Sequence, residues 1–348
     1  MQLYENLRQD IVKGLYPYGK KLPSKRLLAE ETGVSVITVE HAYNILADEG
    51  YIESRQRSGY FVTYKESDFA HTSETPQPSS LPAVAPNAST ASSFPYSVLA
   101  NTMRRVLSQY GEALLAKSPN RGCQQLRFAI SAYLARSLGM RVTAEQIIIG
   151  SGAEYLYSLI VQLLGNDRIY ALEDPCYEKI HRVYTANGAK CEKLKLGHDG
   201  IKTAELQTSN ASVLHITPFH SYPSGITADV SKRMEYLRFA DSRKGYIIED
   251  NYDSELTVSR KNEDTVFSLS KQENVIYLNT FSHTIAPSMR VGYMVLPAKL
   301  LEEFEKKLGF YSCTVPIFEQ YVLAQLIEEG DFERHINRVR RMRRKKSL

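Results

Sequence analysis

The chain has 348 residues, a formal net charge of +4 and an ordinary composition, with 43% hydrophobic and 24% charged residues. This length allows two or three domains, and no apolar run is long enough to cross a bilayer. The polar N-terminus does not resemble a signal peptide, and the four cysteines lack metal-ligand spacing. We therefore expect free thiols and a cytoplasmic location.

The first sixty residues predict a small helical domain that ends in a hairpin. Apolar residues recur at helical spacing over residues 2–13, 24–33 and 34–50, which predicts three helices. Two short strands are predicted over residues 51–53 and 59–62, with a polar and basic tip between them. Three helices followed by such a hairpin predict a winged helix, a fold that binds double-stranded DNA.

The polar side chains of this region suit a DNA duplex. Hydroxyl and imidazole groups on the third helix could reach base edges, and basic side chains nearby could neutralise phosphates. The predicted DNA-binding residues are Lys25, Arg26, Ser35, Thr38, His41, Arg55 and Arg57. The alternative is a helical domain with a solvated charged face.

One motif carries a specific resemblance. The run from Leu22-Pro23-Ser24 through Gly33-Val34-Ser35 to Gly50-Tyr51-Ile52 resembles the winged helix of the GntR family of bacterial regulators. The family usually has Arg directly after the Ser of the Gly-Val-Ser turn, where this chain has Val36. We therefore expect one phosphate or base contact to be missing.

A change of composition divides the rest of the chain. Residues 65–93 are rich in Pro, Ser and Thr and predict a linker between a winged helix at 1–64 and a large domain at 94–348. In the large domain, helices alternate with short apolar strands, which predicts an α/β fold with a mostly parallel sheet covered on both faces. The strands are predicted at 146–150, 168–172, 211–217, 245–250, 275–278 and 291–296.

Polar residues follow several of these strands. The small residues Ser151, Gly152 and Ala153, followed by Glu154, open a helix and suit an anion, while Thr280, Ser282 and Arg290 suit a phosphate. Ligands of such sheets bind beyond the carboxyl ends of the strands. Each residue alone is better explained by packing, a cap or a turn, so the individual signals are weak.

Taken together, these segments resemble fold-type I aminotransferases, and the whole chain resembles the MocR branch of the GntR regulators. In that branch a winged helix is fused to an aminotransferase-like domain that binds pyridoxal 5′-phosphate (PLP). The resemblance implies a phosphate site, a stacking Tyr177, an Asp250 paired with the ring nitrogen and a Tyr252 bonded to the ring's phenolic oxygen. The implied cofactor-binding residues are Gly152, Ala153, Glu154, Tyr177, Tyr222, Asp250, Tyr252, Thr280, Ser282, His283 and Arg290.

Two departures from the family carry most weight. His283 stands where the family has the Lys that forms a Schiff base with PLP, and an imidazole has no primary amine. We therefore expect PLP to bind without a covalent bond, if it binds. The family continues for roughly a hundred residues beyond Arg343 as a small lobe that supplies an Arg for an amino-acid carboxylate. This chain stops at Leu348, so we expect that lobe to be missing and the large domain to be truncated.

These observations leave three functions open. The favoured one is a homodimeric transcriptional regulator that binds an operator duplex, with a large domain that senses PLP or an amino compound or serves as a dimerisation scaffold. The alternative is a PLP-dependent aminotransferase-like enzyme, against which His283 and the missing lobe both argue. The third is a regulator whose pocket no longer binds a ligand.

Overall fold

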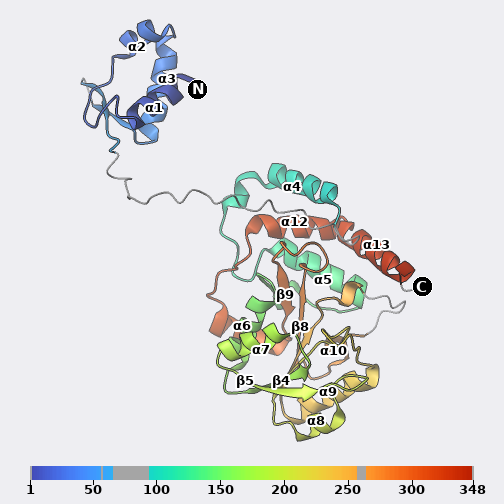
Figure 1. The fold of residues 1–348 in the computed structure, drawn as a ribbon. Helices are drawn as coiled ribbons and strands as arrows, with labels where there is room; N and C mark the ends of the chain where they lie inside the picture. The colour runs from blue at the N-terminus through green and yellow to red at the C-terminus, as the bar shows by residue number, and fades with distance from the viewer. Residues whose placement is uncertain (1, 56–57, 66–93, 257–263, 347–348) are drawn as a thin grey trace. The chain divides into compact units, whose positions relative to one another are not determined.

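The computed structural model describes residues 2–55, 58–65, 94–256 and 264–346, which fall into two compact units divided between Ala85 and Pro86 (Figure 1). We call them the small unit and the large unit. The predicted linker, apart from Lys65, lies outside the described residues.

The small unit has the three helices and the hairpin that the sequence predicts. Its elements are α1 (Gln2–Val12), α2 (Lys25–Thr32), α3 (Val36–Asp48), β1 (Ile52–Arg55) and β2 (Gly59–Val62). Ser24 and Ser35 cap α2 and α3, because each side-chain oxygen accepts the backbone N–H three residues later, from Leu27 and Thr38. Strands β1 and β2 pair antiparallel, and the core closes around Tyr43 and Leu46, which are both fully buried. The winged-helix prediction is confirmed.

The large unit is built on a seven-stranded sheet of order β3-β9-β8-β7-β6-β4-β5 (Figure 1). Strands β8, β7, β6, β4 and β5 are parallel, and β9 pairs antiparallel with both of its neighbours, β3 and β8. The strands are β3 (Ile147–Gly150), β4 (Ile169–Asp174), β5 (Lys190–Lys195), β6 (Val213–Ile216), β7 (Tyr246–Asp250), β8 (Val275–Thr280) and β9 (Gly292–Val295).

Helices cover both faces of this sheet because successive side chains of each buried strand point to opposite sides. Ile147 and Ile149 pack with the helices α5 and α12, whereas Ile148 packs with α6 and α11. The remaining helices of the large unit complete the two layers, and the mostly parallel α/β prediction is confirmed. The helices are α4 (Tyr96–Tyr110), α5 (Gln124–Leu138), α6 (Ala153–Leu164), α7 (Glu178–Ala186), α8 (Thr203–Thr208), α9 (Val230–Ser242), α10 (Val266–Leu269), α11 (Leu301–Leu308), α12 (Ile317–Glu328) and α13 (Asp331–Lys346).

The last helix, α13, contacts two segments that are distant from it in the sequence. The guanidinium of Arg343 donates to the backbone oxygen of Leu256 at 3.1 Å and to the carboxylate of Asp253 at 3.2 Å. Nearer the start of the helix, the imidazole of His335 lies against the ring of Phe94, with ring centroids 4.9 Å apart. Helix α13 therefore contacts both the loop after β7 and the first described residue of the large unit.

The structure adds one strand that the sequence analysis did not predict, the edge strand β5. Within the described ranges, none of the helices combines the length and apolar character that a membrane span requires.

Candidate functional site

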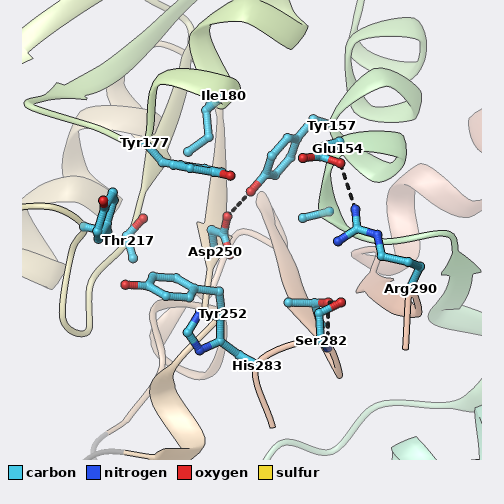
Figure 2. Close-up of a pocket in the computed structure, with 13 residues that line it drawn as sticks. Glu154, Tyr157, Tyr177, Ile180, Thr217, Asp250, Tyr252, Ser282, His283 and Arg290 are labelled. Atoms are coloured by element: carbon cyan, nitrogen blue, oxygen red, sulfur yellow. Dashed lines mark hydrogen bonds and ion pairs between the residues drawn. The ribbon is translucent and has the colours of Figure 1, made fainter. Parts of the chain in front are cut away.

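A cavity of about 250 Å³ opens at the carboxyl ends of β4, β6, β7 and β8 (Figure 2). This is the place where a parallel sheet offers polar loop residues to a ligand. Every predicted cofactor-binding residue except Gly152 lines it. The lining residues are Ala153, Glu154, Tyr157, Tyr177, Ile180, Thr217, Tyr222, Asp250, Tyr252, Thr280, Ser282, His283 and Arg290.

One end of the cavity is formed by the start of α6. Gly152 precedes this helix with a φ of +87°, a conformation that favours glycine, and leaves the first backbone N–H groups of the helix available for an anion. A Cβ at this position would lie 2.8 Å from a guanidinium nitrogen of Arg290. Gly152 thus serves the site by letting Arg290 approach the helix start, although it does not line the cavity itself.

Two hydroxyls face the same end. Thr280 donates to the backbone oxygen of Val291 at 3.2 Å, and Ser282 donates to that of Met289 at 2.9 Å. Both hydroxyls would have to rotate to donate to a ligand. Arg290, which was predicted to bind the phosphate with them, already forms an ion pair, because its Nη2 lies 2.8 Å from Glu154 Oε2.

The carboxylate of Glu154 is held between two cations. Its second oxygen accepts from Lys179 Nζ at 2.8 Å. The hydrogen bond from Lys179, with a smaller contribution from Arg290, holds the pKa of Glu154 below its ordinary value. The family resemblance listed Glu154 among the cofactor-binding residues, and the structure shows that its negative side chain forms an ion pair with Arg290 (Figure 2).

Asp250 is a buried acidic residue of the cavity lining, with only 3% of its surface exposed. Its Oδ2 accepts a short hydrogen bond from Tyr157 Oη and lies 3.7 Å from His215 Nε2. Its Oδ1 has no hydrogen-bond partner among the residues that the structure describes. Burial, and next the negative charge of Asp250, raises the pKa of Tyr157 well above its ordinary value, which keeps this phenol a donor.

Aromatic side chains form the walls beside Asp250. Tyr177 lies above the cavity in Figure 2 and meets Tyr222 edge to face, with ring centroids 6.0 Å apart. Tyr252 lies below, and its hydroxyl donates to the backbone oxygen of His220 at 3.2 Å. Burial raises the pKa of Tyr252 to about 12, so its hydroxyl stays protonated at neutral pH.

His283 lies beside Tyr252, with ring centroids 5.2 Å apart. Its Nδ1 is 3.8 Å from Asp253 Oδ1, while His220 Nδ1 is 3.4 Å from Asp253 Oδ2. The imidazole of His283 therefore faces the buried carboxylate of Asp253 at a distance longer than a hydrogen bond. None of the described residues that line the cavity is a lysine.

Three lining residues were missed by the sequence analysis. Tyr157 follows Ala153 by four residues, so helical spacing places both on one face of α6. Thr217 directly follows strand β6, in the position that the argument from strand ends already marked. Ile180 is an apolar helix residue that carries no sequence signal of a site.

The predicted DNA-binding residues lie in the small unit, and two of the basic ones are neutralised by neighbours. Lys25 forms an ion pair with Glu40, and Arg55 one with Glu53 at 2.5 Å. Arg26 and His41 are exposed to solvent. Ser35 and Thr38, at the start of α3, share a hydrogen bond between their hydroxyls at 2.8 Å. Arg57 lies outside the described residues.

Comparison with known sequences identifies the small unit. The family of bacterial regulatory proteins called gntR matches residues 1–62. The HTH-type transcriptional regulator YdeL of Bacillus subtilis (strain 168) is 33% identical over 361 residues, which cover 99% of this chain and 76% of that protein. The probable rhizopine catabolism regulatory protein MocR of Rhizobium meliloti is 29% identical over 364 residues, with 98% and 74% covered.

Comparison with solved structures identifies the fold of the large unit. The α-aminoadipate aminotransferase LysN of Thermus thermophilus, complexed with N-(5′-phosphopyridoxyl)-L-leucine, has a TM-score of 0.64 at 25% identity, with 71% of this chain and 64% of that chain covered. An archaeal alanine:glyoxylate aminotransferase has a TM-score of 0.64 at 22% identity, with 70% and 62% covered. The chain thus spans slightly less than two thirds of these enzymes, and the second likeness shows the fold alone. The chain belongs to the MocR-type branch of the GntR family of bacterial transcriptional regulators, in which a DNA-binding winged helix precedes an aminotransferase-like domain.

Proposed function

We propose that the large unit is a sensor that binds PLP without a covalent bond, and that the bound ligand controls how the winged helix binds its operator. The observation that carries this proposal is the cavity itself. Residues that are far apart in the sequence line one space, and one of them is the buried Asp250, whose carboxylate has one oxygen without a described hydrogen-bond partner.

The residues present fit PLP. Asp250 Oδ1 can accept a hydrogen bond from a protonated ring nitrogen, while Tyr157 keeps the other oxygen satisfied. Tyr177 offers a ring face or edge to the pyridine, and the start of α6 with Arg290 offers donors to the phosphate. PLP supplies a phosphate anion and an electron-withdrawing ring when it is bound. The structural relative LysN binds a phosphopyridoxyl compound, which supports the same ligand class here.

The surroundings of His283 support non-covalent binding. Its imidazole stands where the family resemblance expects the lysine amine, and its Nδ1 lies 3.8 Å from Asp253 Oδ1. An imidazole can donate or accept a proton but cannot form an imine. We therefore propose that the protein is a regulator and does not catalyse transamination, in agreement with the names of its sequence relatives.

Ligand control of DNA binding is proposed to act through a homodimer in the cytoplasm. Two winged helices held by one dimer would match two half-sites of an operator. The large unit carries exposed apolar side chains on and after α4, including Tyr96, Leu107 and Leu115, which support a partner surface. Sedimentation of the full chain tests this: a monomer at micromolar concentration would contradict the homodimer.

The central test is a titration of the full chain with PLP, followed by absorbance, with and without candidate amino acids. A saturable change is expected, and Asp250→Asn should weaken binding about tenfold because a charge-assisted hydrogen bond is lost. The matched control is Asp167→Asn, an exposed turn residue outside the cavity. The same samples are then tested for a shift of a duplex from the gene's own promoter region.

Each outcome decides between functions. No saturable PLP signal, together with DNA binding, would support the regulator that has lost its ligand. A covalent adduct on any lysine after borohydride treatment would reject the non-covalent proposal. Turnover of an amino acid with a keto acid would favour the enzyme.

A further inference from the structure

The first turn of α3 exposes two neighbouring branched apolar side chains. Val36 is 42% exposed and Ile37 is 78% exposed. The buried face of the same helix is formed by Val39, Tyr43 and Leu46, none of which is measurably exposed. Val36 and Ile37 therefore contribute little to the core of the small unit.

Neither residue is explained by the stability of the helix. Branched side chains lower helix propensity, and an alanine would suit an exposed position better. A single exposed apolar residue is ordinary on a protein surface. Two adjacent ones at the start of the helix that a winged helix directs at base edges are a more specific signal.

The surroundings indicate what covers these side chains. Ile37, His41 and Asn44 are exposed and follow one another at i, i+4 and i+7, so they share the solvent face of α3. The carboxylate of Glu40, on the adjoining surface, is neutralised by Lys25. The first two turns of this face therefore carry no unpaired acidic side chain that would repel a DNA backbone, and the exposed Asp48 lies at the opposite end of the helix.

We propose that Val36 and Ile37 contact the C5-methyl groups of thymines, and that the operator carries thymine where the first turn of α3 enters the major groove. The C5-methyl group of thymine is the apolar group that a base pair presents in this groove. Val36 occupies the position where the family resemblance expects an arginine. The chain thus replaces a polar contact with an apolar one and gains a preference for thymine at that base.

The experiment uses the full chain and duplexes selected by it from a pool with a randomised centre of roughly 20 base pairs, enough for two half-sites about one helical turn apart. Each thymine of a selected duplex is replaced singly by deoxyuridine, which removes only the methyl group. One or two replacements in each half-site should weaken binding about threefold to fivefold, as expected for one apolar methyl contact. In Ile37→Ala or Val36→Ala, the corresponding replacement should have no further effect.

The variants have a matched control. Leu15→Ala removes a side chain that is 62% exposed but lies outside α3, and it should keep the full deoxyuridine effect. Circular dichroism checks that each variant stays folded, and alanine is compatible with a helix start.

Three results would overturn the inference. The first is a set of selected duplexes without a favoured thymine. The second is an equal deoxyuridine effect in wild type and both variants, because another residue would then contact the methyl. The third is a change of oligomeric state in Ile37→Ala without any deoxyuridine effect, because a second copy of the chain would then cover this surface.

Discussion

The ion pair between Glu154 and Arg290 makes Glu154→Gln the most informative change in the cavity. A phosphate that binds at the start of α6 must share Arg290 with the carboxylate of Glu154, which already lies 2.8 Å from the guanidinium. The substitution keeps the size of the side chain and its hydrogen-bonding oxygen but removes the negative charge. We expect PLP and inorganic phosphate to bind more tightly.

The expected gain in affinity follows from the repulsion between the two negative charges. A carboxylate and a doubly charged phosphate on one guanidinium lie about 5 Å apart, which costs about 1–2 kcal/mol at the dielectric constant of water. Removal of this repulsion corresponds to roughly a fivefold to thirtyfold lower Kd. The fold should be little affected, because the side chains of Glu154 and Arg290 are 36% and 51% exposed and such pairs contribute about 0–1 kcal/mol.

The assay is a titration with PLP, followed by absorbance, with inorganic phosphate as competitor. Glu178→Gln is the matched control, since Glu178 forms an ion pair with Lys193 but does not line the cavity. Unchanged or weaker phosphate binding by Glu154→Gln would refute the reasoning and assign Glu154 a direct role in holding the ligand.

Three further predictions test other parts of the chain. His283→Lys should permit a covalent bond to PLP, so borohydride should leave a pyridoxyl group on that lysine by mass spectrometry; its absence while PLP still binds would show that residue 283 is out of reach. Arg26→Ala should weaken binding to a promoter duplex and reduce the magnitude of the slope of log K against log salt by about 1. Substitution of the exposed Arg238 of the large unit by alanine should change neither, and an unchanged slope in Arg26→Ala would show that Arg26 does not contact a phosphate. Burial raises the pKa of Glu173 to about 7, above its ordinary 4.5, so the folded state holds the proton more tightly and stability falls as pH rises from about 4.5 to 7. Glu173→Gln should reduce this loss in the free energy of unfolding by up to roughly 3 kcal/mol. Melting temperatures at pH 5 and pH 8 measure it, and an unchanged pH dependence in the variant would contradict the burial argument.

Most of the architecture could be predicted from the sequence because the buried strands are short continuous apolar runs. Strand β3, for example, is three isoleucines and a glycine, all buried. Strand β5 was missed because charged residues such as Lys190 and Lys195 interrupt its apolar pattern. Such charges are typical of a strand at the edge of a sheet. The antiparallel direction of β9 could not be predicted either, since an apolar run carries no information about direction.

The composition of the cavity could be predicted for a different reason. The family resemblance implied its residues, and the topology explains why they meet: Tyr177, Asp250 and Thr280 lie at or just after strands whose carboxyl ends share one edge of the sheet. The ion pairs could not be predicted in this way. Glu154 and Arg290 are 136 residues apart, and Lys25 and Glu40 belong to different helices, so each pair depends on how distant segments pack and which rotamers the packing permits.

The contacts of α13 have a consequence for communication within the large unit. Through Arg343, the helix contacts Asp253, which faces the imidazole of His283 beside the cavity. Through His335, it contacts Phe94, at which the described part of this unit begins. A ligand that displaced Asp253 would break the hydrogen bond that Asp253 accepts from Arg343, and Arg343 lies on the same helix as His335. Helix α13 is therefore one continuous element in contact with a carboxylate beside the cavity and with the residue at which the described part of the large unit begins, and a coupling between these two places would have to pass through such an element.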